Sequence, residues 1–138
     1  MSCYLNIYLV PKKEKVEKNE PLLLYFFSRN SDVYHIVTDS INVPFCDNEI
    51  TYKDLTLDDM VHIVSGHKGI IDDAKRRLQS LYNLYSKNAN SELQEDILCS
   101  ENYIVELEES LQTLIHIKDI VERCDGLSDF EKVVVNQG

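Results

Sequence analysis

Apolar residues recur along the second half of the chain at alternating steps of four and three residues. The first run consists of Met60, Val64, His67, Ile71, Ala74, Leu78, Leu81 and Tyr85. A second run follows a polar break and consists of Leu93, Ile97, Ser100, Ile104, Leu107, Leu111, Leu114, Lys118 and Val121. This spacing is typical of a coiled-coil seam. It predicts two long helices that fold back on each other as an antiparallel hairpin over residues 55–125.

Capping signals support the two predicted helices. Thr56 and Asp59 have the spacing of a capping box at the start of the first helix. Ser91 and Gln94 have the same spacing at the start of the second, and Gly126 follows its last turn. Each helix therefore has a predicted beginning, and the second also has a predicted end.

Two glycines, Gly66 and Gly69, lie inside the first predicted helix. Each costs roughly 1 kcal/mol relative to alanine in a helix interior. The apolar pattern keeps its phase through both positions, so we predict one continuous helix. We also expect that the missing side chains let a neighbouring backbone come close.

Charge predicts the same register for the hairpin. The second helix has no basic residue between Lys87 and Lys118 and carries Glu92, Glu95, Asp96, Glu101, Glu106, Glu108 and Glu109. A hairpin that closes near residue 89 places Lys75, Arg76 and Arg77 opposite this acidic stretch. At the open end, it places Asp58 and Asp59 opposite Lys118 and Arg123. Exposed pairs of this kind set register more than they add stability.

The first 54 residues contain short apolar segments separated by turn residues. Predicted strands cover residues 3–10, 22–28, 33–38, 41–45 and 49–53, and the proline at 44 limits the fourth to a sheet edge. The continuous apolarity of residues 22–28 predicts burial on both faces. In the tail, Ser128 and Glu131 favour a short helix, whereas Val133–Val135 favours a strand, which we prefer.

These elements predict a single α+β domain. An N-terminal antiparallel meander of three to five strands (residues 1–54) packs on the helical hairpin (55–125), and a short strand or helix follows (126–138). A length of 138 residues, with 43% hydrophobic and 28% charged residues, fits such a domain.

Net charge and cysteine spacing limit the classes of function. A formal net charge of −10 disfavours direct binding to nucleic acid or to an anionic membrane. The four cysteines are far apart in sequence, which excludes a CxxC redox motif or a zinc knuckle. Because we find no secretory signal either, we expect reduced thiols and a cytoplasmic location.

Candidate chemical sites have simpler structural explanations. His62, His67 and His116, with Asp59, give only one Asp-x-x-His pair, whereas metal-binding bundles repeat such pairs on several helices. His67 falls on the seam, where packing explains it. Cys99 and Cys124, near His116 in the hairpin, fit small core residues on apolar helix faces better than nucleophiles. We therefore expect no catalytic residue, no metal and no cofactor.

The second predicted helix has more apolar surface than one partner helix covers. Leu98, Val105, Ile115, Ile117 and Ile120 lie beside its seam and form a candidate self-association face. Glu101, Glu106, Glu108 and Glu109 form a candidate acidic face for a partner protein. The expected function is a non-enzymatic protein–protein interaction or assembly module, a homo-oligomer formed through the hairpin.

Two alternatives remain open. The acidic stretch also fits a small inhibitor protein that blocks a basic, nucleic-acid-binding partner. A small-molecule enzyme or sensor in a crevice between sheet and hairpin would depend on Tyr34, His35 and Cys46. The small size, acidic balance and Asn-, Lys-, Ile- and Tyr-rich composition resemble accessory proteins of bacteriophages or AT-rich bacteria. That likeness is one of composition and assigns no residue a role.

Overall fold

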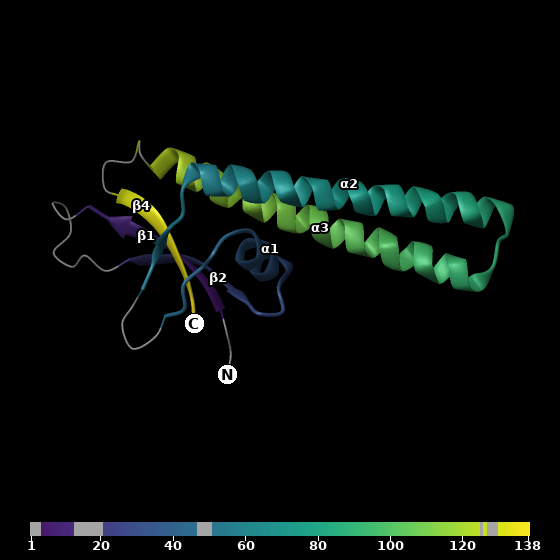
Figure 1. The fold of residues 1–138 in the computed structure, drawn as a ribbon, viewed down its shortest axis with the longest axis horizontal. Coiled ribbons are helices and arrows are strands. Elements are labelled where there is room, and N and C mark those ends of the chain that lie inside the picture. The colour runs from purple at the N-terminus through teal and green to yellow at the C-terminus, as the bar shows by residue number, and fades with distance from the viewer. Residues whose placement is uncertain (1–3, 13–20, 47–50, 125, 127–129) are drawn as a thin grey trace.

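The protein is an α+β domain whose long helical hairpin extends well beyond a small antiparallel sheet (Figure 1). The computed structural model describes residues 4–12, 21–46, 51–124, 126 and 130–138. Its elements are β1 (Tyr4–Pro11), β2 (Leu22–Ser28), α1 (Asp32–Ser40), β3 (Lys53–Asp54), α2 (Leu57–Lys87), α3 (Ser91–Cys124) and β4 (Phe130–Gln137). The predicted fold class is confirmed.

The sheet has the strand order β2-β1-β4-β3, and every neighbouring pair is antiparallel. The tail is the predicted strand, but it lies between β1 and β3, so the predicted meander is wrong. Leu5, Ile7 and Leu9 of β1 are buried and alternate with half-buried residues. This period-two pattern indicates that one face of the central strand forms part of the core.

Strand β2 lies at the edge of the sheet, and the prediction that both its faces are buried is wrong. Leu22, Leu23 and Phe26 are exposed. Tyr25 packs edge-on against His116 of α3, with ring centroids 6.1 Å apart. An unbroken apolar run is typical of a central strand but does not require one, because an edge strand can also leave apolar side chains in water.

Residues 33–38, predicted as a strand, belong to helix α1. The Oγ of Ser31 accepts a 3.2 Å hydrogen bond from the backbone N–H of Tyr34 and caps this helix. Val33, Tyr34 and Val37 are buried on one helical face. Their β-branched and aromatic side chains favour strands, but the cap and the burial of that face outweigh this propensity.

The remaining N-terminal strand predictions are only partly correct. Residues 42–44 form no regular element, and Phe45 makes one isolated parallel bridge to Gln137. The predicted strand 49–53 corresponds to the two-residue β3, while residues 47–50 lie outside the described part of the chain. This segment borders the sheet as expected without forming a full strand.

The hairpin follows its predicted boundaries closely. Helix α2 runs without interruption through Gly66 and Gly69, and the capping box of Thr56 and Asp59 is present. No neighbouring atom lies within 4 Å of a Cβ built on either glycine, so the expected close approach of a backbone is wrong. At the start of α3 the cap is Asn90, whose Oδ1 accepts a 2.8 Å hydrogen bond from the N–H of Leu93. The predicted cap, Ser91, is the first helical residue.

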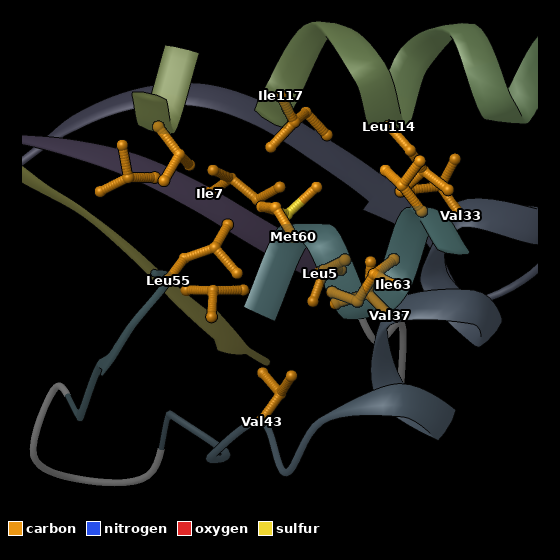
Figure 2. Packing of buried hydrophobic residues seen from close by; sticks show 14 of the residues in the cluster. Leu5, Ile7, Val33, Val37, Val43, Leu55, Met60, Ile63, Leu114 and Ile117 are labelled. Carbon is orange, nitrogen blue, oxygen red and sulfur yellow. The ribbon is translucent and has the colours of Figure 1, made fainter. Parts of the chain in front are cut away.

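All seventeen residues of the two predicted seams are buried or half-buried, which confirms the predicted inner face of each helix. At its base, the hairpin contributes Met60 and Ile63 from α2 and Leu114 and Ile117 from α3 to the main core. Figure 2 shows these side chains near those of β1 and α1 in the same cluster. A smaller second core contains Ile71, Ala74, Ile104 and Leu107. It belongs to the hairpin alone.

Candidate functional site

The far part of the hairpin, residues 75–101, extends away from the sheet and is called the distal hairpin below (Figure 1). Its seam residues are only half-buried, because two helices cover each other on one side only; they are Leu78, Leu81, Tyr85, Leu93, Ile97 and Ser100. Tyr82, Leu84 and Leu98 add exposed apolar surface outside the seam. Large exposed apolar patches on a helical surface mark interaction sites.

The structure separates the five residues of the predicted self-association face. Leu98 is 58% exposed and Val105 is 53% exposed. Ile115 and Ile120 are half-buried against the main core, and Ile117 is 1% exposed inside it. Ile117 is therefore a core residue of the cluster that joins α3 to the sheet, and of the five residues only Leu98 and Val105 are more than half exposed.

The two helices of the distal hairpin carry opposite charge. Between residues 75 and 87, α2 has four basic residues and no acidic one: Lys75, Arg76, Arg77 and Lys87. Between residues 91 and 101, α3 has four acidic residues and no basic one: Glu92, Glu95, Asp96 and Glu101. The distal hairpin is thus neutral as a whole but divided lengthwise into a basic and an acidic helix.

Some of these charges already interact within the hairpin. The Nζ of Lys75 lies 3.1 Å from the Oε1 of Glu108, so Lys75 faces the acidic stretch as predicted. The hydroxyl of Tyr82 donates a 2.6 Å hydrogen bond to the Oε1 of Glu101. This hydrogen bond raises the pKa of Tyr82, because it stabilises the protonated phenol beside a carboxylate.

Other predicted charge contacts differ. In the candidate acidic face, Glu106 and Glu109 are exposed, whereas Glu101 and Glu108 have the partners given above. At the base of the hairpin, Asp59 pairs with Lys53 of β3 at 3.2 Å. Among the described residues, neither Asp58 nor Asp59 forms an ion pair with Lys118 or Arg123, the residues predicted to lie opposite them. The short strand β3 supplies a cation nearer to the helix start than α3 does.

A second candidate site is a crevice of about 270 Å³ where α1 meets the hairpin, called the α1 crevice below. It is lined by Asp32, His35, Ile36, Asp39 and Ser40 of α1, Gly66, His67 and Ile70 of α2, and Tyr103 and Leu107 of α3. Three elements that are far apart in sequence therefore form one concave surface. None of these lining residues is a lysine or an arginine.

His67 is the buried polar group of the α1 crevice. It is 1% exposed, and its Nε2 lies 2.7 Å from the carbonyl oxygen of Leu107. A carbonyl only accepts hydrogen bonds, so Nε2 carries the proton and donates it. The Nδ1 atom is also buried and has no hydrogen-bond partner among the residues that the structure describes. Such an unsatisfied buried atom is uncommon in a folded protein.

The histidines and cysteines considered as chemical sites lie apart. His62 and His116 are exposed, and the described residues contain no cluster of three His, Cys, Asp or Glu side chains that fits a metal ion. Cys124 is buried in the main core as predicted, but Cys99 is exposed, so its prediction as a core residue is wrong.

The crevice proposed from sequence is only partly present. His35 lines the α1 crevice, but Tyr34 points its hydroxyl at Gln137 over 2.7 Å inside the core. Cys46 is exposed and does not line the crevice. Sequence reasoning missed Asp32 and Asp39, which share a helix face at a spacing of seven residues. Recognising residues 32–40 as a helix would have revealed that face.

Comparison with models of known protein families, with curated protein sequences and with solved structures finds no match for this chain. Within the described residues, each helix falls short of the length or the apolarity that crossing a bilayer requires.

Proposed function

We propose that the protein is a non-enzymatic protein–protein interaction module that self-associates through the distal hairpin. The observation that carries this proposal is the lengthwise division of charge between two helices whose apolar seam is half-open. When two copies meet around a two-fold axis, α2 of each copy can lie beside α3 of the other. Two-fold pairing is also the commonest closed arrangement of identical subunits.

Apolar burial supplies the driving force in this arrangement. Leu84 and Leu98 are 54% and 58% exposed, and they flank a seam that a second hairpin would cover. Burial of apolar surface contributes roughly 25 cal/mol per Å². A four-helix bundle made from two hairpins would bury these residues and give the seam a full shell of neighbours.

Charge determines which helices meet. With α2 beside α3 of the other copy, the basic residues of one helix face the acidic residues of its neighbour on both sides of the bundle. With α2 beside α2, like charges would face each other. The proposal therefore specifies both the occupant of this surface and its orientation.

A charge-exchange experiment tests the orientation. One variant carries Arg77→Glu and Lys87→Glu, and a second carries Glu95→Lys and Asp96→Lys; all four residues are exposed in the wild type. We expect each variant alone to be a folded monomer by light scattering. In the first variant α2 of the distal hairpin becomes neutral, and in the second α3 does, so the substituted helix no longer attracts the helix that it would face in the other copy. An equimolar mixture should restore the dimer, since opposite charges again face each other.

Two results would contradict the proposal. A wild-type protein that stays monomeric at high micromolar concentration would exclude self-association. A wild-type dimer whose two charge variants also dimerise would exclude the proposed orientation of the helices. Circular dichroism of each variant serves as the folding control, because the helical signal should be unchanged.

Apolar substitutions test the location of the interface. Leu84→Ser with Leu98→Ser should weaken the dimer at least about tenfold, because both exposed leucines lose their apolar contacts. Val61→Ser is the control, since Val61 is 48% exposed on α2, close to the exposure of Leu84, but lies at the base of the hairpin. Equal weakening by the control would place the interface elsewhere.

The alternative is an acidic inhibitor of a basic, nucleic-acid-binding partner. The exposed carboxylates of Glu106 and Glu109 favour it, because neither has the interactions found at Glu101 and Glu108. It predicts a monomer that forms a salt-sensitive complex with such a partner. The basic stretch of α2 (residues 75–87) lies beside the acidic stretch of α3 (residues 91–101), and this pairing of opposite charges favours self-association instead.

A further inference from the structure

We propose that the α1 crevice binds a small organic amine: a cation with an apolar body. This inference does not depend on self-association, because none of the residues that line the crevice belongs to the distal hairpin. It follows from three properties of the crevice, which are its shape, its polar groups and its unsatisfied histidine.

The shape is that of a small-molecule site. The crevice holds about 270 Å³ and lies where three helices meet, close to the size at which clefts accept small ligands. Ile36, Ile70 and Leu107 give it apolar walls, and Tyr103 adds an aromatic ring. Gly66 forms part of the wall, and no atom lies within 4 Å of a Cβ built at that position. The absent side chain thus leaves open space on this side.

The polar groups select for positive charge. Asp32 and Asp39 of α1 both line the crevice, and no lysine or arginine is among the lining residues. Neither aspartate has an ion-pair partner among the described residues. They lie seven residues apart, about 10.5 Å along the helix axis at 1.5 Å per residue. A cation bound anywhere between the two aspartates is therefore close enough to a carboxylate for a favourable electrostatic interaction.

The buried His67 requires a donor. Its Nε2 proton is already given to Leu107, so Nδ1 presents a lone pair that no described residue satisfies. An ammonium group supplies three N–H donors and no acceptor, which complements both the lone pair and the carboxylates. A carboxylate or phosphate ligand would instead meet two like charges and a second acceptor. A ligand with an amine group on an apolar body therefore matches both the polar groups and the apolar walls of the crevice.

Titration followed by methyl NMR tests this proposal with 2-phenylethylamine as the probe and 2-phenylethanol as its uncharged counterpart. We expect the amine to shift the methyl signals of Ile36 and Ile70 in a saturable way. The alcohol should bind at least about tenfold more weakly, because it lacks the charge-assisted hydrogen bonds. Equal affinities would overturn the assignment of a cation, and the absence of saturable shifts with the amine would overturn the site.

Matched variants test where the amine binds. Gly66→Leu fills the crevice and should abolish the shifts at Ile36, whereas Gly69→Leu adds the same side chain to open space on the same helix and should not. Asp39→Asn should weaken the amine about threefold to tenfold, and Asp72→Asn, on an exposed residue outside the crevice, should not. Undiminished binding by both the Gly66→Leu and Asp39→Asn proteins would overturn the proposal. Circular dichroism establishes that each variant is folded.

Discussion

The Nε2 of His67 donates a 2.7 Å hydrogen bond to the carbonyl oxygen of Leu107 and joins α2 to α3 inside the seam of the hairpin. The other ring nitrogen, Nδ1, is buried without a partner among the described residues. The hydrogen bond of Nε2 therefore stabilises the contact between the helices, whereas the burial of Nδ1 without a partner destabilises the folded state.

This balance leads to a prediction for two substitutions. His67→Leu removes the interhelical hydrogen bond and the unsatisfied nitrogen together and keeps most of the volume. We expect it to change the free energy of unfolding by less than about 1.5 kcal/mol. His67→Ala leaves a cavity in a site that is 1% exposed and should cost about 2–4 kcal/mol.

Urea denaturation of both variants measures these free energies. If leucine costs as much as alanine, then the hydrogen bond to Leu107, and not packing, is what His67 contributes. If leucine is tolerated as expected, folding does not need the imidazole of His67. Ligand binding in the α1 crevice would then explain why a histidine is present at this position.

The hairpin could be predicted from sequence because its information is local. A seam that repeats every seven residues determines which face of each helix is buried, whatever lies elsewhere in the chain. The capping box at Thr56 and Asp59 likewise depends on four consecutive residues. Each of these features was found where the sequence placed it.

The sheet order and the α1 crevice could not be predicted in the same way. The pairing of β4 with β1 joins residues 119 to 132 positions apart, such as Leu5 and Gln137, and its pairing with β3 joins residues 80 to 82 positions apart. No local pattern specifies either pairing. The crevice was hidden by one error, the strand predicted at residues 33–38. Val33, Ile36 and Val37 favour a strand by propensity, and a strand would place Asp32 and Asp39 on opposite faces.

Replacing Gly66 or Gly69 by alanine should stabilise the protein. Both glycines lie inside α2, neither has a positive φ angle, and no atom lies within 4 Å of a built Cβ. Alanine restricts the unfolded chain and favours the helix, so each substitution should add about 0.5–1 kcal/mol to the free energy of unfolding. Chemical denaturation is the measurement. A loss of stability in either variant would mean that the backbone of α2 departs from a regular helix there.

Two residues of the predicted self-association face should respond in opposite ways. Ile117 is 1% exposed in the main core, so Ile117→Ala should cost about 2–4 kcal/mol in the free energy of unfolding. Leu98 is exposed, so Leu98→Ala should change the stability of the monomer by no more than about 0.5 kcal/mol. Denaturation at low protein concentration separates these effects from those of dimerisation. Similar costs for both residues would contradict the described packing of α3.

The tyrosine that was predicted as part of a chemical site should prove structural. The Tyr34 hydroxyl donates to the Oε1 of Gln137, and the Nε2 of Gln137 donates over 2.8 Å to the carbonyl oxygen of Val43. Tyr34→Phe leaves the buried Oε1 without its donor, which should cost about 1–3 kcal/mol. Tyr25→Phe is a suitable control, because the hydroxyl of this half-buried tyrosine has no hydrogen bond to any of the described residues. Equal stability of the Tyr34→Phe protein and the wild type would show that this hydrogen bond adds nothing.

The capping box at the start of α2 should make stability depend on pH. Partial burial raises the pKa of Asp59, but hydrogen bonds from Thr56 and Lys53 lower it by more, so the pKa lies below its ordinary value of 3.8. A group whose pKa is lower in the folded state stabilises the protein above its unfolded pKa, and this contribution disappears as the pH falls through the folded value. The advantage of Asp59 should therefore be complete at pH 6 and decline below about pH 4.

Comparison of Asp59→Asn with the wild type measures this dependence. Asparagine can still accept a hydrogen bond from the Thr56 N–H but lacks the charge that pairs with Lys53 at 3.2 Å. The wild type should be the more stable protein at pH 6, and the difference should shrink as the pH is lowered towards 2. Asp58→Asn, one position earlier and exposed, controls for the general effect of an acidic residue in the first turn. The opposite result would be a difference in the free energy of unfolding between wild type and Asp59→Asn that grows as the pH falls. It would show that the ionised carboxylate of Asp59 is not the stabilising form.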